Sequence, residues 1–148
     1  MELLPIHENE SLNATFRDNP DCEVILQMTL DFYKRVGFNE PWICYFVRAG
    51  DEIVGSCGIK GKPKNGAIEI AYGTFPRHEG KGIATEICRQ LVHLSLRTDP
   101  TVRITARTLP EENASARVLR KNGFELLGVV WDEEDGEVWE WEFKKNDP

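Results

Sequence analysis

The sequence predicts an α+β fold in which helices flank a mixed, largely antiparallel central sheet. Three observations support this class. Residues 42–75 contain three β-rich runs separated by turn residues, which is the pattern of a meander. Residues 82–96 change to a helical period, and the chain ends in two more β-rich runs around a turn. Strands that follow one another without an intervening helix favour antiparallel pairing.

A helix is predicted before the meander, after a short N-terminal strand. Asn19 is suited to the N-cap, Pro20 to the first helical position and Gly37 to the end of the helix. The apolar face of this helix is predicted to be a stripe of residues at four-residue spacing, namely Val24, Met28, Phe32 and Val36.

The remaining elements follow from changes of period and from turn residues. Asn65-Gly66 predicts the second turn of the meander. Gly123 is suited to end the last helix, because glycine adopts the left-handed conformation easily. The expected strands are residues 42–48, 52–60, 67–75, 101–108, 124–130 and 137–143, and the expected helices are residues 82–96 and a shorter one within 110–123.

Length, charge and cysteine usage limit the possible functions. The 148 residues suit one domain covering 1–148, with a core that needs no disulfide. A net charge of -7 argues against a nucleic-acid partner, since phosphate binding requires clustered Lys and Arg. The four cysteines lack metal-ligand spacing, so no metal is expected. No apolar run approaches the roughly 18 residues of a membrane span, which favours a cytoplasmic protein without a membrane partner.

Two glycines, Gly80 and Gly82, lie where a strand-like run meets the helix at residues 82–96. The first N–H groups of a helix lack carbonyl partners and carry partial positive charge, so they favour an anion. Glycines there let the backbone approach a phosphate closely. The alternative is that both glycines only form a tight turn. Neither a Walker loop nor a GxGxxG motif is present.

The segment EIAYGTFPRHEGKGIATEI around these glycines resembles the signature of the GNAT superfamily of N-acetyltransferases. The later segment ARTLPEENASARVLRKNGFELLG is similar to the helix and strand that follow in the ribosomal-protein N-terminal acetyltransferase-like branch. Together the resemblance covers about residues 43–143. It implies a GNAT-like sheet, acetyl-CoA as cosubstrate, no metal, and direct attack of a primary amine on the acetyl group.

The resemblance also implies which residues hold the coenzyme. The family pattern [Q/R]xxGx[G/A] fits residues 79–84 with Glu79 at its first position, and also fits a register that begins at Arg77; the first is preferred. Lys81 is either a point charge for the diphosphate or a solvated surface lysine. The implied diphosphate-binding residues are Gly80, Lys81, Gly82, Ile83, Ala84 and Thr85.

The pantetheine arm is expected to pair with the strand before the glycines, like an added strand. The resemblance places Gly73, Thr74 and Phe75 along it, and Gly73 is predicted to mark a bulge that splays the sheet, or else to be a packing glycine. Asn113 is implied as a further coenzyme contact, although it lies one position later than the Asn of that branch.

Acetyl transfer requires a neutral amine, and a lysine-like amine with a pKa of about 10.4 is mostly protonated at pH 7. Glu69 matches the carboxylate that some family members use as a general base, or else it pairs with a lysine on the sheet surface. Leu119 lies where many members have a tyrosine that protonates the thiolate, and Ser115 is the candidate for this role. Helix capping is the alternative role for Ser115 and Asn113. Tyr72 lies on the opposite strand face from Glu69 and is interpreted as packing.

The acceptor, a small molecule or a peptide, is not identified by the sequence. Three alternatives stay open: a protein N-terminal acetyltransferase, a small-amine or antibiotic acetyltransferase, and a non-catalytic coenzyme-A-binding regulator, each as a monomer or homodimer. One clue is a cluster of negative charge near the C-terminus. It would attract a cationic amine, or else it only keeps a turn soluble. Residues 132–142 contain seven carboxylates, namely Asp132, Glu133, Glu134, Asp135, Glu137, Glu140 and Glu142.

Overall fold

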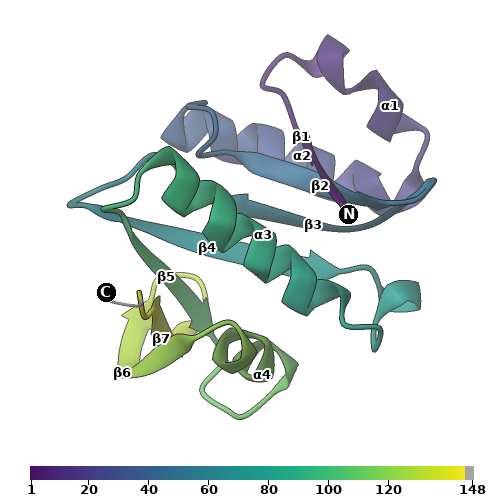
Figure 1. The fold of residues 1–148 in the computed structure, drawn as a ribbon. Helices are drawn as coiled ribbons and strands as arrows, with labels where there is room; N and C mark the ends of the chain where they lie inside the picture. Colours follow the sequence, from purple (N-terminus) through teal and green to yellow (C-terminus); the bar gives the residue numbers. More distant parts are fainter. Residues whose placement is uncertain (146–148) are drawn as a thin grey trace.

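A computed structural model describes residues 1–145 of the chain. Its centre is a seven-stranded mixed sheet with the strand order β1-β2-β3-β4-β5-β7-β6. Every neighbouring pair is antiparallel except β4 and β5, which run parallel. Figure 1 shows helices on both sides of this sheet. The predicted α+β class with a largely antiparallel sheet is therefore confirmed.

The predicted elements are present with small shifts at their ends. The strands are β1 (Glu2–Pro5), β2 (Cys44–Ala49), β3 (Glu52–Ile59), β4 (Ala67–Thr74), β5 (Arg103–Thr108), β6 (Phe124–Asp132) and β7 (Gly136–Phe143). The helices are α1 (Ala14–Arg17), α2 (Pro20–Val36), α3 (Ile83–Thr98) and α4 (Ala114–Lys121), with 3-10 turns η1 (Glu10–Asn13) and η2 (Pro76–His78). The sequence did not predict η1, α1 or η2, which are each only one turn long.

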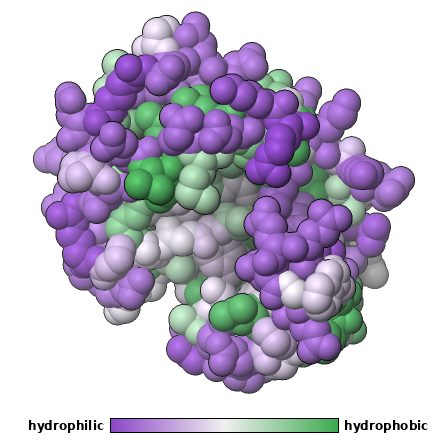
Figure 2. All heavy atoms as spheres, turned by 180° about the vertical axis from the view of Figure 1, so that it is seen from behind, coloured by the Kyte–Doolittle hydropathy of each residue, from purple (hydrophilic) through white to green (hydrophobic). Residues whose placement is uncertain are grey.

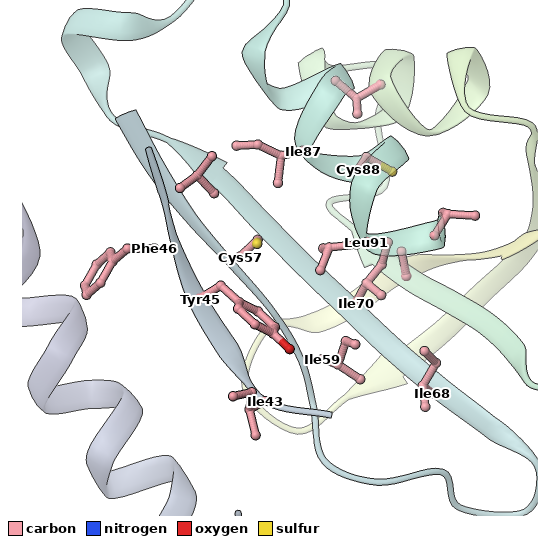
Figure 3. Packing of buried hydrophobic residues seen from close by; sticks show 14 of the residues in the cluster. Ile43, Tyr45, Phe46, Cys57, Ile59, Ile68, Ile70, Ile87, Cys88 and Leu91 are labelled. Atoms are coloured by element: carbon pink, nitrogen blue, oxygen red, sulfur yellow. The ribbon is translucent and has the colours of Figure 1, made fainter. Parts of the chain in front are cut away.

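The two faces of the sheet are covered differently. Helix α3 lies in front of β3 and β4 in Figure 1, and α2 lies behind the sheet. Figure 3 shows Ile87 and Leu91 of α3 on the side of the helix that faces the sheet, with Leu91 beside Ile70 of β4, and all three are almost completely buried. This interface forms the main core, and it fixes the position of the start of α3 relative to β4.

The predicted apolar stripe of α2 is wrong. Its caps are as expected, with Asn19 accepting a hydrogen bond from the backbone N–H of Asp21 at 3.0 Å. However, Val24 is 68% exposed and Met28 is 65% exposed. Residues at four-residue spacing rotate by about 40° per step around a helix, so the stripe leaves the core face. The buried residues instead combine steps of three and four, namely Cys22, Leu26, Thr29 and Tyr33.

Strands β4 and β5 separate part of the way along. Their parallel pairing joins residues 67–70 of β4 to residues 103–106 of β5. Beyond Ile70, β4 continues to Thr74 while paired only with β3. The main-chain edge of residues 71–74 that faces β5 is therefore open. We call the gap between the diverging strands the slot.

The bulge predicted at Gly73 is absent, because β3 and β4 keep one continuous register through it. The glycine that the packing requires is Gly55 on β3, where a Cβ atom would lie 2.4 Å from the carbonyl oxygen of Gly73. The slot instead forms because β5 leaves β4 and pairs with β7 on its other side.

Three further observations apply to residues 1–145. No helix in this range is long and apolar enough to cross a membrane. The described residues include no cluster of three or more His, Cys, Asp or Glu side chains that could hold a metal ion.

The four cysteines are free thiols, and burial raises the pKa of Cys22 and of Cys44 to about 11.

Candidate functional site

The start of α3 presents unpaired backbone amides. Gly80 and Gly82 have φ values of +79° and +75°, and a Cβ atom at either would meet nothing within 4 Å. Both positions favour glycine because of their positive φ, which other residues adopt only with strain, and not because a side chain would clash. The space in front of both residues is open. The N–H groups of Gly80, Lys81 and Gly82 donate no hydrogen bond to the backbone or side chains described here. The N–H groups of residues 83–85 lie in the first turn of α3, so no earlier turn of the helix supplies a carbonyl oxygen to accept from them.

Asn122 holds this helix start against α4. Its side-chain amide Nδ2 donates to the carbonyl oxygen of Thr85 at 3.2 Å and to that of Val118 at 3.0 Å. Asn122 was not predicted as part of the site from the sequence. The signal was its position directly before Gly123, where a polar side chain at the end of a helix often bonds backbone carbonyls.

The three residues implied along the slot differ in what they offer. Gly73 is exposed, and Thr74 has a buried hydroxyl without a partner in the described chain. Phe75 has a buried ring, and its N–H donates to the carbonyl oxygen of Val54 at 2.8 Å. The open backbone edge therefore ends at Thr74, and Phe75 belongs to the core beside it.

The start of α4 lies across the slot from β4. Asn113 is the N-cap, and its Oδ1 accepts a hydrogen bond from the N–H of Ala116 at 2.9 Å, so it has the capping role. Ser115 is exposed and makes no capping bond. The hydroxyl of Tyr72 lies 3.4 Å from the carbonyl oxygen of Ser115. The structure thus brings together Tyr72, interpreted as packing, and Ser115, a predicted catalytic residue.

A cleft of about 820 Å³ lies on the face of the sheet opposite α3, between α2 and the tip of the β6–β7 hairpin. Figure 2, which views the molecule from this side, shows the hollow with apolar residues above it and hydrophilic residues beside it. Its floor consists of residues with small side chains, namely Ser56, Gly58, Ala71 and Gly73. Its walls include Ile25, Met28 and Phe32 of α2 and residues 131–134 at the hairpin tip.

Charged side chains form a network at one end of this cleft. Glu69 Oε2 lies 2.7 Å from Lys60 Nζ, and Glu69 Oε1 lies 4.0 Å from Arg107 Nε. Arg107 also binds Asp132, with Nη1 2.9 Å from its Oδ1, and Glu140, with Nη2 3.2 Å from its Oε2. Glu69 therefore pairs with a lysine, as one of its two predicted roles required, and its carboxylate also borders a second, smaller pocket that opens between β4 and β5.

The network changes the acidity of its members. Burial of Arg107 opposes its charge, but the hydrogen bonds that Arg107 donates to Asp132 and Glu140, together with the negative charges of Glu69 and Glu140, outweigh burial and raise its pKa. The same hydrogen bond from Arg107, with backbone N–H groups of the turn, lowers the pKa of Asp132. Both groups thus stay ionised, and Asp132 anchors the hairpin tip to β5.

Sequence reasoning missed Lys60, Arg107 and Trp131 in this cleft. Arg107 lies two residues after Thr105, the register partner of Glu69, so its side chain lies on the same face of the sheet as Glu69. The parallel pairing of β4 with β5 that brings the two together was not predicted. Trp131 is 73% exposed at the hairpin tip and lines the cleft. The two predicted carboxylates beside it, Glu133 and Glu134, do line the cleft.

Free amides at a helix start can bind phosphates, and an open strand edge can pair with an extended ligand. The cleft on the other face of the sheet offers a separate space for a second ligand. The chain belongs to the GNAT acetyltransferase family, because the model of the acetyltransferase (GNAT) domain matches residues 7–125. The resemblance seen in the sequence is confirmed.

Similar proteins and structures agree with this family. N-acetyltransferase p20 of Bacillus licheniformis is 33% identical over 125 residues, which cover 83% of this chain and 69% of that protein. N-acetyltransferase YjdG of Bacillus subtilis is 40% identical over 76 residues, which span only 45% of its length and 51% of this chain.

Solved structures share the fold. The aminoglycoside acetyltransferase AAC(6')-Ib in complex with coenzyme A superposes with a TM-score of 0.67 at 20% identity, covering 97% of this chain and 93% of that chain. A spermidine N-acetyltransferase SpeG chimera from Vibrio cholerae and hSSAT gives a TM-score of 0.71 at 15% identity, covering 97% and 95%. At these identities the likeness shows the fold alone.

Proposed function

We propose that the protein is an acetyl-CoA-dependent N-acetyltransferase that transfers the acetyl group to a primary amine by direct attack. One observation carries this proposal: the same strand, β4, has an open edge at residues 71–74 and leads on to the free amides at the start of α3. This strand also borders the cleft through Ala71 and Gly73, and the smaller pocket through Glu69. The family membership supports it, and so do the related structures of AAC(6')-Ib and RimL in complex with coenzyme A.

The coenzyme is assigned to residues of this chain as follows. The N–H groups of residues 80–85 bind the diphosphate, and exposed Lys81 adds positive charge. The free edge of β4 at Gly73 and Thr74 pairs with the pantetheine arm, and the buried ring of Phe75 supports it. Asn113 still has its side-chain amide N–H groups free to donate, since capping uses only its oxygen.

Glu69 receives the proton of the amine, directly or through water. Deprotonating an amine of pKa about 10.4 at pH 7 costs about 4.6 kcal/mol, from roughly 3.4 pH units at about 1.36 kcal/mol each. A positioned general base contributes about 10² to 10⁴ in rate. The ion pair with Lys60 holds the Glu69 carboxylate at the end of the cleft. The nitrogen then attacks the carbonyl carbon, and the C–S bond breaks.

The acceptor is an amine, from a small molecule or a peptide, that carries an apolar group and a positive charge. Ile25, Met28 and Phe32 offer an apolar wall, and Trp131 faces it from the hairpin tip. Glu133 and Glu134 line the same cleft and form no ion pair within residues 1–145. We further propose that the protein acts in the cytoplasm, as a monomer or homodimer.

A screen of amines with acetyl-CoA, followed by coenzyme A release, tests this function. The panel contains arylalkylamines, linear polyamines, polyhydroxylated amines and peptides with free N-termini. We expect the highest kcat/KM for an arylalkylamine or for a peptide with an apolar first residue. A preference for polyhydroxylated amines would contradict the apolar wall as the specificity element.

A non-catalytic coenzyme-A-binding regulator is the second candidate. The observation that favours it is Leu119, which is completely buried at the position where the resemblance expects a tyrosine. Binding of acetyl-CoA without release of coenzyme A for any amine in the panel would support the regulator. Failure to bind acetyl-CoA at all would exclude both candidates.

A further inference from the structure

We propose that Tyr72 donates a hydrogen bond to the coenzyme sulfur as the acetyl group leaves. Tyr72 on β4 thereby takes the part that the resemblance assigns to a tyrosine on the last helix. The inference rests on the proposed acetyltransferase function. It concerns a residue that neither the sequence motifs nor the family membership assigns to the reaction.

Position 119 offers no proton donor near the slot. Leu119 has no exposed surface and belongs to the hydrophobic core under α4. Its side chain has no polar atom, so another group must stabilise the negative charge that develops on the departing sulfur. Two hydroxyl groups lie at the start of α4: that of Ser115, in its first turn, and that of Tyr72, whose oxygen lies 3.4 Å from the carbonyl oxygen of Ser115.

The position of Tyr72 on β4 directs its hydroxyl across the slot. Tyr72 is the second residue after the pairing of β4 with β5 ends at Ile70. Side chains alternate along a strand, so Tyr72 shares the α3 face with the buried Ile68 and Ile70, opposite Glu69. Its hydroxyl reaches the first turn of α4, near the carbonyl oxygen of Ser115. The phenol therefore spans the opening in which the thioester must lie.

The hydroxyl of Tyr72 is held less tightly than those of the other two tyrosines. Tyr33 donates to the carbonyl oxygen of Ile6 at 2.8 Å, and Tyr45 donates to that of Pro41 at 2.7 Å. The 3.4 Å distance from Tyr72 to Ser115 exceeds the usual O–H···O range of about 2.5–3.0 Å. Tyr72 thus has a hydroxyl near the slot that remains available to a ligand.

The chemistry needs a donor that keeps its proton. Burial is the main cause that raises the pKa of Tyr72, so the phenol stays protonated at neutral pH. When the amine nitrogen bonds the carbonyl carbon, the electron pair of the C–S bond moves to sulfur. The Tyr72 O–H donates to that pair. The ammonium loses one proton through Glu69 to water before the attack, and the attacking nitrogen loses a second proton to water as the C–S bond breaks. The thiolate takes one proton from water, so the reaction releases one proton overall.

Two ligands that differ only at sulfur test the contact directly. Calorimetry with coenzyme A and with desulfo-coenzyme A is done at pH 9, above an ordinary thiol pKa of about 8.5, so that thiolate is populated. We expect Tyr72→Phe to weaken coenzyme A about 3- to 10-fold and to leave desulfo-coenzyme A unchanged. With the best amine of the panel, kcat should fall about 10- to 100-fold while KM for the amine changes less than about 2-fold.

Tyr45→Phe is the matched control, because it removes a hydroxyl that donates to the carbonyl oxygen of Pro41 and lies away from the slot. It should change neither kcat nor the ratio of the affinities for coenzyme A and desulfo-coenzyme A. Equal weakening of both ligands by Tyr72→Phe, or an unchanged kcat, would overturn the proposal and leave the acetyltransferase function intact. A larger loss of kcat in Ser115→Ala would also overturn it, since the serine would then be the donor. Wild-type protein that binds no coenzyme A would overturn the function and this inference together.

Discussion

The helix start at α3 and the cleft across the sheet are built from different parts of the chain. Main-chain groups form the first, because the open amides, the φ values of Gly80 and Gly82 and the free edge of β4 all belong to the backbone. Side chains from α2, β3, β5 and the β6–β7 tip form the second. A backbone site depends on local sequence, whereas a side-chain site depends on which distant elements meet. Substitutions should therefore separate the two sites cleanly.

The largest effect is expected from Gly82→Glu, which breaks the backbone site. A side chain at φ +75° is strained, and a carboxylate there repels the diphosphate. Acetyl-CoA binding should fall below detection in calorimetry. Gly66→Glu is the matched control, since Gly66 has φ +77° and equally open surroundings in the turn before β4. The control should lose similar stability and keep binding; acetyl-CoA affinity at the wild-type level in Gly82→Glu would contradict the prediction.

The next largest effect is expected from Glu69→Gln at the chemical step. Loss of the base should lower kcat about 100-fold at pH 7, with partial recovery near pH 10 as the amine deprotonates unaided. Glu142→Gln serves as control, because Glu142 also pairs with an arginine, Arg103 at 3.2 Å, elsewhere on the sheet. A pH–rate profile of Glu69→Gln parallel to that of the wild type would remove Glu69 from the mechanism.

Arg107→Met should affect the side-chain site alone. It leaves Asp132 and Glu140 without their cation and releases the hairpin tip from β5. We expect KM for the amine to rise about 10-fold and the free energy of unfolding to fall by about 1–2 kcal/mol, with acetyl-CoA affinity unchanged. Steady-state kinetics, denaturant unfolding and calorimetry measure the three quantities. An equal loss of acetyl-CoA affinity would show that the two sites are not separable.

The smallest effect concerns steering by charge. Neutralising Glu133 and Glu134 to Gln should raise KM for a cationic amine about 2- to 4-fold at 0.01 M salt, and the difference should vanish near 0.15 M as the Debye length falls from about 30 Å to about 8 Å. The control pair, Glu8→Gln with Glu111→Gln, removes the same charge from exposed positions outside the cleft. A preference for anionic acceptors would reject steering.

The accuracy of the sequence analysis follows the same division. The element order and the glycines at the start of α3 were predicted correctly, because helical period and glycine spacing are local properties. The buried face of α2 was not, since it includes the polar residues Thr29 and Tyr33, and the Tyr33 hydroxyl can be buried only because it donates to the carbonyl oxygen of Ile6 directly after β1. A lysine partner of Glu69 was one of its two predicted roles, and Lys60 is that lysine. Arg107 was missed as a second partner, because its contact requires the parallel pairing of β4 with β5.

The short parallel ladder between β4 and β5 also has a mechanical consequence. Four residue pairs, from Ala67 with Arg103 to Ile70 with Ala106, join strands β1–β4 to strands β5–β7 within the sheet. A cosubstrate arm bonded along the free edge of β4 adds a brace where this ladder stops. Amide hydrogen exchange of residues 71–74 should then slow when acetyl-CoA binds, and the thermal midpoint should rise with its concentration. We therefore expect bound acetyl-CoA to stiffen the sheet that the acceptor meets.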